Sequence, residues 1–396
     1  GGSSSSTREH SYFSAFMKMP WSKEPEPLEA VLPDGAVDSS ALLTYTVAVL
    51  GTCVFLRKCP HGASDSVALL LFFVFWYVGN AFYNQYNTLA IGATGGKHGG
   101  LTMTVSTMQL GVCTLYAMLL WLANKNPIKL CGLQLAESMP FPAVNGKDIV
   151  STLPVAFCSA AAHSAGVFCL GADPLFGQIV KAGEPVLSAL VNTVFYKKRP
   201  SMPKILCLFF IVGGVAFASL KKGLDGAYKL KFDETALLFG MIGNTFAAFK
   251  GAETKKLMTV PGLKDRMGGV ANQFAVTECL AFAISLPVMF ATEGAKWGTF
   301  MHLLATNRDL QVGLFVSGLS FYLYNELATM TIKATGAVTS SVANTAKRVI
   351  VMVYMAAVTG KVLTEEQKIG AGVAIGFVLV YSVIDDVLAS LKKKTA

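Results

Sequence analysis

Long apolar stretches recur along this chain, and they constrain its fold more than any other feature. From residue 65 onward each stretch runs for about 20 residues, which is the length that an α-helix needs to cross the ~30 Å hydrocarbon layer of a bilayer. Only 14% of the 396 residues are charged whereas 53% are apolar, and a soluble domain carries roughly 25% charged residues. The sequence therefore predicts an all-α integral membrane protein.

We expect ten membrane-spanning helices, separated by turn and charge signals such as the run Lys197-Lys198-Arg199-Pro200. The expected ranges are 65–89, 100–123, 149–171, 174–196, 204–220, 234–258, 269–292, 309–332, 335–359 and 366–389. Residues 1–64 are expected to form a flexible leader that contains the hydrophobic segment 41–56. That segment is either an eleventh span or a surface segment, because about 16 residues are short for a crossing.

Several function classes are disfavoured by what the chain lacks. The eight cysteines are scattered without a Cys-x-x-Cys pair and the five histidines show no ligand spacing, so we expect no disulfide framework, no metal and no other cofactor. No paired carboxylates mark a catalytic centre, and we expect that the protein is not an enzyme. Despite the net charge of +9, we expect no nucleic-acid partner; the partner that the composition requires is the lipid bilayer.

The chain contains an internal repeat. Val78-Gly79-Asn80-Ala81-Phe82 has a counterpart in Ile242-Gly243-Asn244-Thr245-Phe246, at an offset of 164 residues, and the same offset carries Lys204 onto Lys368. Residues 65–220 and 234–390 are therefore expected to be two copies of a five-helix unit. Because five is odd, the second copy enters the membrane from the opposite face, an inverted arrangement typical of secondary transporters. The alternative is that two glycine-bearing apolar helices align by chance.

Four cations lie within the apolar ranges, where an ionisable side chain is expensive and is a functional candidate by default. They are Lys181, Lys250, Lys347 and Arg348. The repeat offset carries Lys181 to position 345, two residues short of Lys347, so the fourth and ninth helices are equivalent and bring their cations to a similar depth. We therefore expect these charges to converge on one cavity that requires an anion.

Phosphate fits such a cavity best, because it carries about −1.5 to −2 charges and three acceptor oxygens. Arg348 is suited to bind it bidentately, and the lysines act as point charges. Structural alternatives remain open for each cation. One alternative is that Lys181 pairs with Glu184 on its own helix face. Another is that Lys250 extends to the membrane surface. A third is that one of Lys347 and Arg348 faces a neighbouring helix.

Two polar side chains on flanking helices are further candidates for the same cavity. His163 lies in the middle of the third expected helix, where it serves either as a ligand group or as a hydrogen-bonding contact between helices. Tyr324, on the eighth, either donates its hydroxyl to a substrate oxygen or is an aromatic residue at the membrane interface.

The motifs around these residues resemble those of the plastid triose-phosphate/phosphate translocators, members of the drug/metabolite transporter superfamily. The similarity covers most of 65–390, and its most specific parts are the Lys-Arg pair with its preceding asparagine and the Lys-x-x-Glu-Pro motif. The segments concerned are Phe321-Tyr322-Leu323-Tyr324-Asn325-Glu326, Ala343-Asn344-Thr345-Ala346-Lys347-Arg348, Ile179-Val180-Lys181-Ala182-Gly183-Glu184-Pro185 and Trp76-Tyr77-x-x-Asn80.

The resemblance implies ten helices and an antiport that exchanges inorganic phosphate for phosphorylated sugars or three-carbon acids across the plastid (chloroplast) inner envelope. It implies that Lys181, Lys347 and Arg348 clamp phosphate, and that His163 and Tyr324 contact the rest of the substrate. Lys250 stands where the family usually has arginine.

The expected partners are phosphate and phosphorylated three-carbon metabolites, because Leu327-Ala328-Thr329 is more similar to the triose-phosphate branch than to the other branches. The alternatives are a phosphoenolpyruvate or hexose-phosphate exchanger, or a nucleotide-sugar transporter of the same superfamily. From other classes, a membrane-embedded enzyme or a non-transporting subunit of a complex stays open.

Overall fold

The structure of the protein is a computed structural model. It describes residues 65–125, 129–130, 133–134, 139–222, 228–230, 232–335, 337–360 and 363–395. The expected leader, 1–64, and its hydrophobic segment, 41–56, lie outside the described residues.

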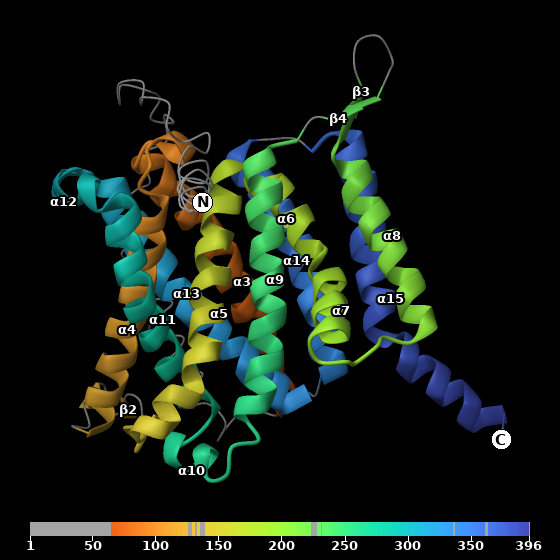
Figure 1. The fold of residues 1–396 in the computed structure, drawn as a ribbon, viewed down its shortest axis with the longest axis horizontal. Coiled ribbons are helices and arrows are strands. Elements are labelled where there is room, and N and C mark those ends of the chain that lie inside the picture. Colours follow the sequence, from red (N-terminus) through yellow and green to blue (C-terminus); the bar gives the residue numbers. More distant parts are fainter. Residues whose placement is uncertain are drawn as a thin grey trace, which may run out of the picture.

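An α-helix occupies each of the ten ranges expected from the sequence (Figure 1). Nine of these ranges hold one helix each, and the fourth, 174–196, is divided between two. In chain order the helices are α3 (Asp65–Ala93), α4 (Thr102–Lys125), α5 (Gly146–Ala172), α6 (Pro174–Ala182), α7 (Glu184–Val194), α8 (Met202–Ala218), α9 (Glu234–Leu257), α11 (Val270–Glu293), α13 (Arg308–Thr335), α14 (Ala337–Thr359) and α15 (Glu365–Thr395).

Short elements that the apolar pattern did not predict fill some of the connections. They are the helices α10 (Leu263–Met267) and α12 (Trp297–Thr306), the 3₁₀ turns η3 (Gly96–His98) and η4 (Gly294–Lys296), and two antiparallel strand pairs, β1 (Lys129–Leu130) with β2 (Leu133–Gln134) and β3 (Leu220–Lys222) with β4 (Tyr228–Leu230). In register, Leu130 faces Leu133 and Lys221 faces Lys229. None of these elements is longer than ten residues, which is too short to cross a bilayer, so a search for membrane-spanning runs does not predict them.

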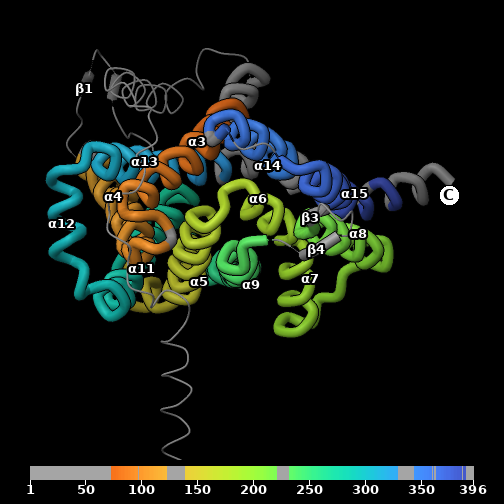
Figure 2. The backbone as a smooth tube through the Cα atoms, turned by 90° about the horizontal axis from the view of Figure 1, so that it is seen from above, coloured from red at the N-terminus to blue at the C-terminus, as the bar shows by residue number. Residues whose placement is uncertain are grey.

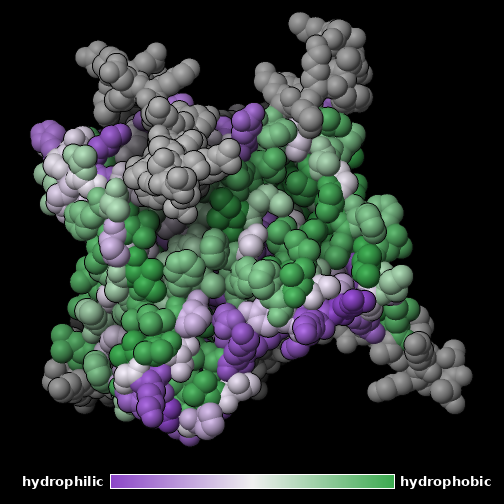
Figure 3. Space-filling model, viewed as in Figure 1, coloured by the Kyte–Doolittle hydropathy of each residue, from purple (hydrophilic) through white to green (hydrophobic). Residues whose placement is uncertain are grey.

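The outer surface of the helix bundle is apolar. Large hydrophobic side chains such as Leu115, Phe209 and Val353 are more than 60% exposed, and Figure 3 shows apolar residues over most of the middle of one face, with hydrophilic residues gathered towards its lower edge. Within the described residues, four segments are long and apolar enough to cross a membrane: Thr102–Leu122, Gly146–Ala172, Val270–Thr306 and Glu365–Asp385. An exposed apolar belt on long helices is what a bilayer requires, so the chain is a helical membrane protein.

The helices pack in pairs that are far apart in the sequence. α3 packs chiefly on α13, α9 on α5, α8 on α15 and α4 on α11. Figure 2 shows α4 and α11 towards one end of the molecule and α8 and α15 towards the other, with α5, α6 and α9 between them. Small residues allow the close approach: a Cβ atom on Gly370 of α15 would lie 2.4 Å from the carbonyl oxygen of Gly214 on α8.

Buried amides also join the helices. The side chain of Gln109 on α4 donates from Nε2 to Asn87 Oδ1 on α3 at 2.9 Å and to Ser317 Oγ on α13 at 2.8 Å. All three side chains are fully buried. Because an unpaired polar group in such a place is costly, these bonds fix the relative position of the three helices.

Candidate functional site

A break in the fourth expected helix positions the first group of site residues. Asp173 caps α6 by accepting hydrogen bonds from the backbone N–H groups of Leu175 and Phe176, each at 3.0 Å. The helix ends at Ala182, because Pro185 lacks an N–H and its ring clashes with the carbonyl group four residues earlier. Lys181 therefore lies in the last turn of α6, and α7 begins at Glu184.

The break is tied to α9, the sixth expected helix, by a residue of the predicted repeat. Asn244 donates from Nδ2 to the backbone oxygen of Val180 at 2.9 Å, and its side chain is buried. The same oxygen accepts a hydrogen bond from the backbone N–H of Gly183 at 3.0 Å, so Asn244 adds a second donor, from α9, at the end of α6. Lys181 and Glu184 are thereby held next to α9.

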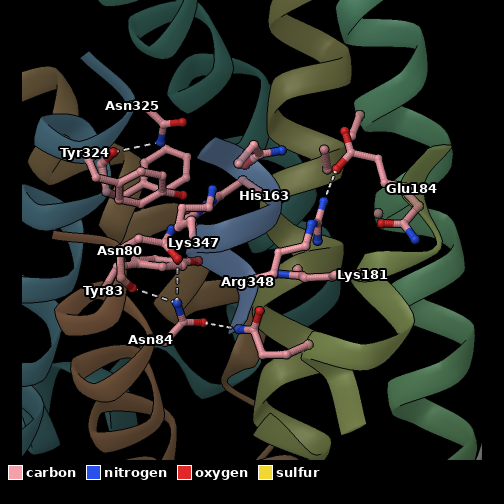
Figure 4. Close-up of a pocket in the computed structure, with 18 of the residues that line it drawn as sticks. Asn80, Tyr83, Asn84, His163, Lys181, Glu184, Tyr324, Asn325, Lys347 and Arg348 are labelled. Carbon is pink, nitrogen blue, oxygen red and sulfur yellow. Dashed lines mark hydrogen bonds and ion pairs between the residues drawn. The ribbon is translucent and has the colours of Figure 1, made fainter. Parts of the chain in front are cut away.

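A cavity of about 260 Å³ lies at this point, lined by residues of α3, α5, α6, α7, α9, α13 and α14 (Figure 4). The structure brings together every site residue that the sequence predicted. Lining the cavity are Lys181, Lys250, Lys347, Arg348, His163 and Tyr324.

Arg348 does not stand uncompensated in the cavity, in contrast to what the sequence led us to expect. Its terminal nitrogen donates to Glu184 Oε2 at 2.5 Å, and the two side chains are 11% and 37% exposed respectively. Glu184 thus pairs with Arg348 across the cavity and not with Lys181 on the neighbouring turn. Lys347 and Arg348, the two adjacent cations on α14, both line the cavity. Neither side chain therefore faces only a neighbouring helix.

Among the residues that the structure describes, Lys181 and Lys347 have no such counter-charge. Neither ammonium group makes a hydrogen bond or an ion pair with the described residues. Lys347 Nζ lies over two aromatic rings, 5.3 Å from the centroid of Trp76 and 5.7 Å from that of Tyr324. The ammonium of Lys181 lies against α5, where a Cβ atom on Gly166 would be only 3.2 Å from Nζ. Aromatic faces stabilise a cation modestly, but they do not neutralise it.

Lys250 faces inward and does not extend to the membrane surface. Its Nζ donates to Ser159 Oγ on α5 at 2.8 Å and lies 3.5 Å from Glu278 Oε1 on α11. Ser159 in turn donates to the same carboxylate oxygen at 2.8 Å. The Lys250 side chain is 30% exposed, whereas that of Glu278 is fully buried. The ammonium group therefore has one side on the cavity and the other on a buried acid.

The two polar candidates on the flanking helices are buried in the cavity wall. The ring of His163 lies 4.3 Å from that of Phe321 and 6.2 Å from that of Tyr83, measured between centroids. Neither His163 nitrogen has a hydrogen-bond partner among the described residues, so the histidine is not a helix-to-helix hydrogen-bonding contact here. Tyr324 is 9% exposed and lines the cavity, so it is not an aromatic residue at the membrane interface.

Other lining residues escaped the sequence-based prediction because uncharged side chains in apolar helices carry a weak signal. Asn80 and Asn244 marked the repeat, and both line the cavity. Gln178 Nε2 donates to Asn84 Oδ1 at 2.7 Å, and Asn84 Nδ2 donates to the backbone oxygen of Asn80 at 2.7 Å. This chain of amides joins α3 to α6 along one wall of the cavity.

A small, polar and cationic cavity between the helices of a membrane protein is typical of a carrier for an anion. Across the part of the chain that is described, no group of three or more His, Cys, Asp or Glu side chains is placed to hold a metal ion.

Comparisons with known proteins agree with this class. A sequence model of the Triose-phosphate Transporter family matches residues 67–382, and the chain belongs to this family. Its members are transporters, so the protein is a transporter and not an enzyme.

The names of similar proteins in this family specify different substrates. The chain is 27% identical to phosphoenolpyruvate/phosphate translocator 3, chloroplastic, of Oryza sativa subsp. japonica, over 81% of this chain and 75% of the relative. It is 26% identical to the triose phosphate/phosphate translocator, non-green plastid, chloroplastic, of Brassica oleracea var. botrytis, over 90% and 83%. It is 25% identical to glucose-6-phosphate/phosphate translocator 2, chloroplastic, of Arabidopsis thaliana, over 81% and 76%. The chain is therefore a membrane transporter of the plastid, and the inner envelope is consistent with this family.

Proposed function

We propose that the protein is an antiporter that exchanges inorganic phosphate for triose phosphate or 3-phosphoglycerate across the plastid inner envelope. The observation that carries the proposal is the presence of Lys181 and Lys347 in one cavity with Arg348, both without an anionic partner among the described residues. Burying such charges is costly unless a counter-ion joins them. A phosphate group provides about −1.5 to −2 charges and three acceptor oxygens, and the names of the relatives support this choice.

We propose a role for the cavity residues at each end of the substrate. We infer that Arg348 binds the phosphate bidentately and that Lys181 and Lys347 act as point charges beside it. His163 and Tyr324 have polar atoms on the wall that faces the rest of the substrate. The volume of about 260 Å³ lies below the ~300–1,000 Å³ of pockets for drug-sized ligands, which favours a compact phosphate over a nucleotide sugar.

We further propose that residues 65–220 and 234–390 form two inverted five-helix halves. The packing supports this, because an in-plane two-fold axis exchanges α3 with α9 and α13 with α5. Under that operation the α3–α13 pair becomes the α9–α5 pair, while the α8–α15 and α4–α11 pairs map onto themselves. These four pairs are among the most extensive helix contacts in the molecule.

Electrostatics then explains why transport is an exchange. An empty cavity that holds several cations resists closing, since their repulsion rises as water is excluded. A bound phosphate neutralises them and lets the halves move past each other, and this alternating access requires no coupling ion. We therefore expect labelled phosphate to leave liposomes far more slowly into buffer alone than into buffer with counter-substrate. Equal rates would contradict the mechanism.

The substrate is tested by counter-exchange with the purified protein in liposomes loaded with labelled phosphate. Outside, the panel is phosphate, dihydroxyacetone phosphate, 3-phosphoglycerate, phosphoenolpyruvate and glucose 6-phosphate, which covers the substrates named in the relatives. We expect the triose phosphate and 3-phosphoglycerate to drive efflux fastest among the organic phosphates. A preference for phosphoenolpyruvate or glucose 6-phosphate would overturn the three-carbon assignment, and no stimulation by any phosphate would overturn the antiport itself.

A further inference from the structure

Glu278 is a carboxylate that the clamp described above does not use. It lies in the middle of α11 with a fully buried side chain. Its Oε1 atom accepts a hydrogen bond from Ser159 Oγ at 2.8 Å, and its Oε2 atom has no hydrogen-bond partner among the described residues. An ionisable group in such a position within a membrane helix is costly and is retained for function by default.

The effect of Glu278 reaches the cavity through Lys250. The Lys250 ammonium lies 3.5 Å from Glu278 Oε1 and 2.8 Å from the bridging hydroxyl of Ser159. Lys250 and Ser159 line the cavity directly, whereas Glu278 does not line it and contacts both of them from behind. A substrate group that approaches Lys250 therefore meets a cation whose charge is already balanced by a buried acid.

The charge of the site follows from its side chains. Lys181, Lys250, Lys347 and Arg348 contribute four positive charges, and Glu184 and Glu278 contribute two negative ones, which leaves two positive charges among the described groups. Phosphate and triose phosphates carry up to two negative charges. A phosphate ester that also bears a carboxylate brings a third, and at the Lys250 end this charge is repelled by Glu278.

We propose that Glu278 is a specificity-determining residue, which neutralises Lys250 so that the site prefers phosphate esters without a carboxylate over those with one. The inference rests on the proposed phosphate antiport and narrows its organic substrate to the triose phosphates. Unit charges roughly 7 Å apart at an effective dielectric constant of ~20 interact strongly enough to change affinity by about tenfold or more. The preference is therefore large enough to measure.

The test compares the wild-type protein with Glu278→Gln in liposomes loaded with phosphate. Homo-exchange of labelled phosphate establishes that each protein transports, and competition by dihydroxyacetone phosphate or 3-phosphoglycerate gives the preference. The wild type is expected to favour the triose phosphate, and Glu278→Gln is expected to shift the ratio about tenfold towards 3-phosphoglycerate while homo-exchange continues. An unchanged ratio, or a wild type that favours the carboxylated substrate, would overturn the assignment of Glu278 and leave the antiport intact.

A double variant, Lys250→Met with Glu278→Gln, keeps the proposal testable where the single variant does not insert. It removes both partners of the ion pair, so it leaves no uncompensated buried charge, and the net charge of the site is unchanged. We expect the wild-type preference; a selective loss of 3-phosphoglycerate would show that Lys250 binds the carboxylate in spite of Glu278. The matched control is Glu253→Gln. Glu253 lies on α9, the helix of Lys250; its carboxylate pairs with Lys256 at 2.7 Å, and the residue does not line the cavity. Its preference is expected to equal that of the wild type.

Discussion

Replacing Glu184 by glutamine is expected to tighten phosphate binding. Arg348 is held by Glu184 Oε2 at 2.5 Å, and in the proposed clamp a phosphate displaces this carboxylate when Arg348 binds it bidentately. A hydrogen bond to a charged group is worth ~1.5–3 kcal/mol net. Because the Glu184 side chain is 37% exposed, water screens the pair and reduces this value to about 1–2 kcal/mol. This corresponds to roughly 5–30-fold higher affinity for phosphate.

The assay is uptake of labelled phosphate into liposomes loaded with phosphate, with initial rates measured over a range of external phosphate concentrations. The same variant is expected to show slower efflux into buffer without counter-substrate, because the empty cavity of Glu184→Gln has one more uncompensated positive charge. The control is Glu365→Gln. Glu365 pairs with Lys368 at 2.7 Å at the start of α15, and its side chain is 76% exposed. This variant should leave both measurements unchanged.

The opposite result would have a definite meaning. If phosphate affinity in Glu184→Gln is unchanged or weaker, Glu184 does not compete with the substrate but holds Arg348 in the orientation that binding requires. If unpaired efflux becomes faster, the repulsion between cations is not what keeps the empty carrier from moving. Either result would refute the reasoning from charge.

Two further predictions concern the clamp and the helix packing. Lys347→Ala and Arg348→Ala are each expected to abolish phosphate exchange in liposomes while the protein still inserts, and near-normal exchange in both would refute the clamp. Gly370→Ala is expected to destabilise the protein by about 1–3 kcal/mol, since the new Cβ would lie 2.4 Å from the Gly214 oxygen. A Cβ at Gly372 would meet no described atom within 4 Å, so Gly372→Ala is the matched control. The melting temperature in detergent measures the difference, and an equal shift in the two variants would contradict close packing of α8 on α15.

Hydropathy and the cost of buried charge predict a large part of this molecule. The expected apolar ranges coincide with helices because a segment in lipid must form all its backbone hydrogen bonds internally, which an α-helix does. A helix that crosses the bilayer needs about 20 apolar residues, and such a run is visible in the sequence. Six predicted site residues from five of these ranges line one cavity. Four of them are cations, and a cation within a membrane helix is costly unless it faces a polar cavity. The break at Gly183 between α6 and α7 was not expected, although Pro185 is a visible signal for it.

What the sequence could not predict are the partners that lie on other helices. Glu184 is three residues from Lys181, and a helical spacing makes that pair the natural expectation; the break in the helix directs Glu184 to Arg348 instead. Glu278 is a lone carboxylate in an apolar range, so the rule that singles out the cations applies to it too. Its pairing with Lys250 depends on how α9, α5 and α11 pack, which hydropathy does not encode.

The Arg348–Glu184 pair also bears on where the proposed halves meet. The two residues are 164 apart in the sequence, the same offset that relates the motif around Asn80 to that around Asn244. If the proposed halves are related by a two-fold axis, residues at this offset are exchanged with each other, and a contact of 2.5 Å between them would place the axis through the pair. Asn80 and Asn244, which are also exchanged, both line the cavity. In the proposed inverted arrangement the cationic cavity would then lie on the axis itself, and we would expect a rocking motion of the halves to open it to either side.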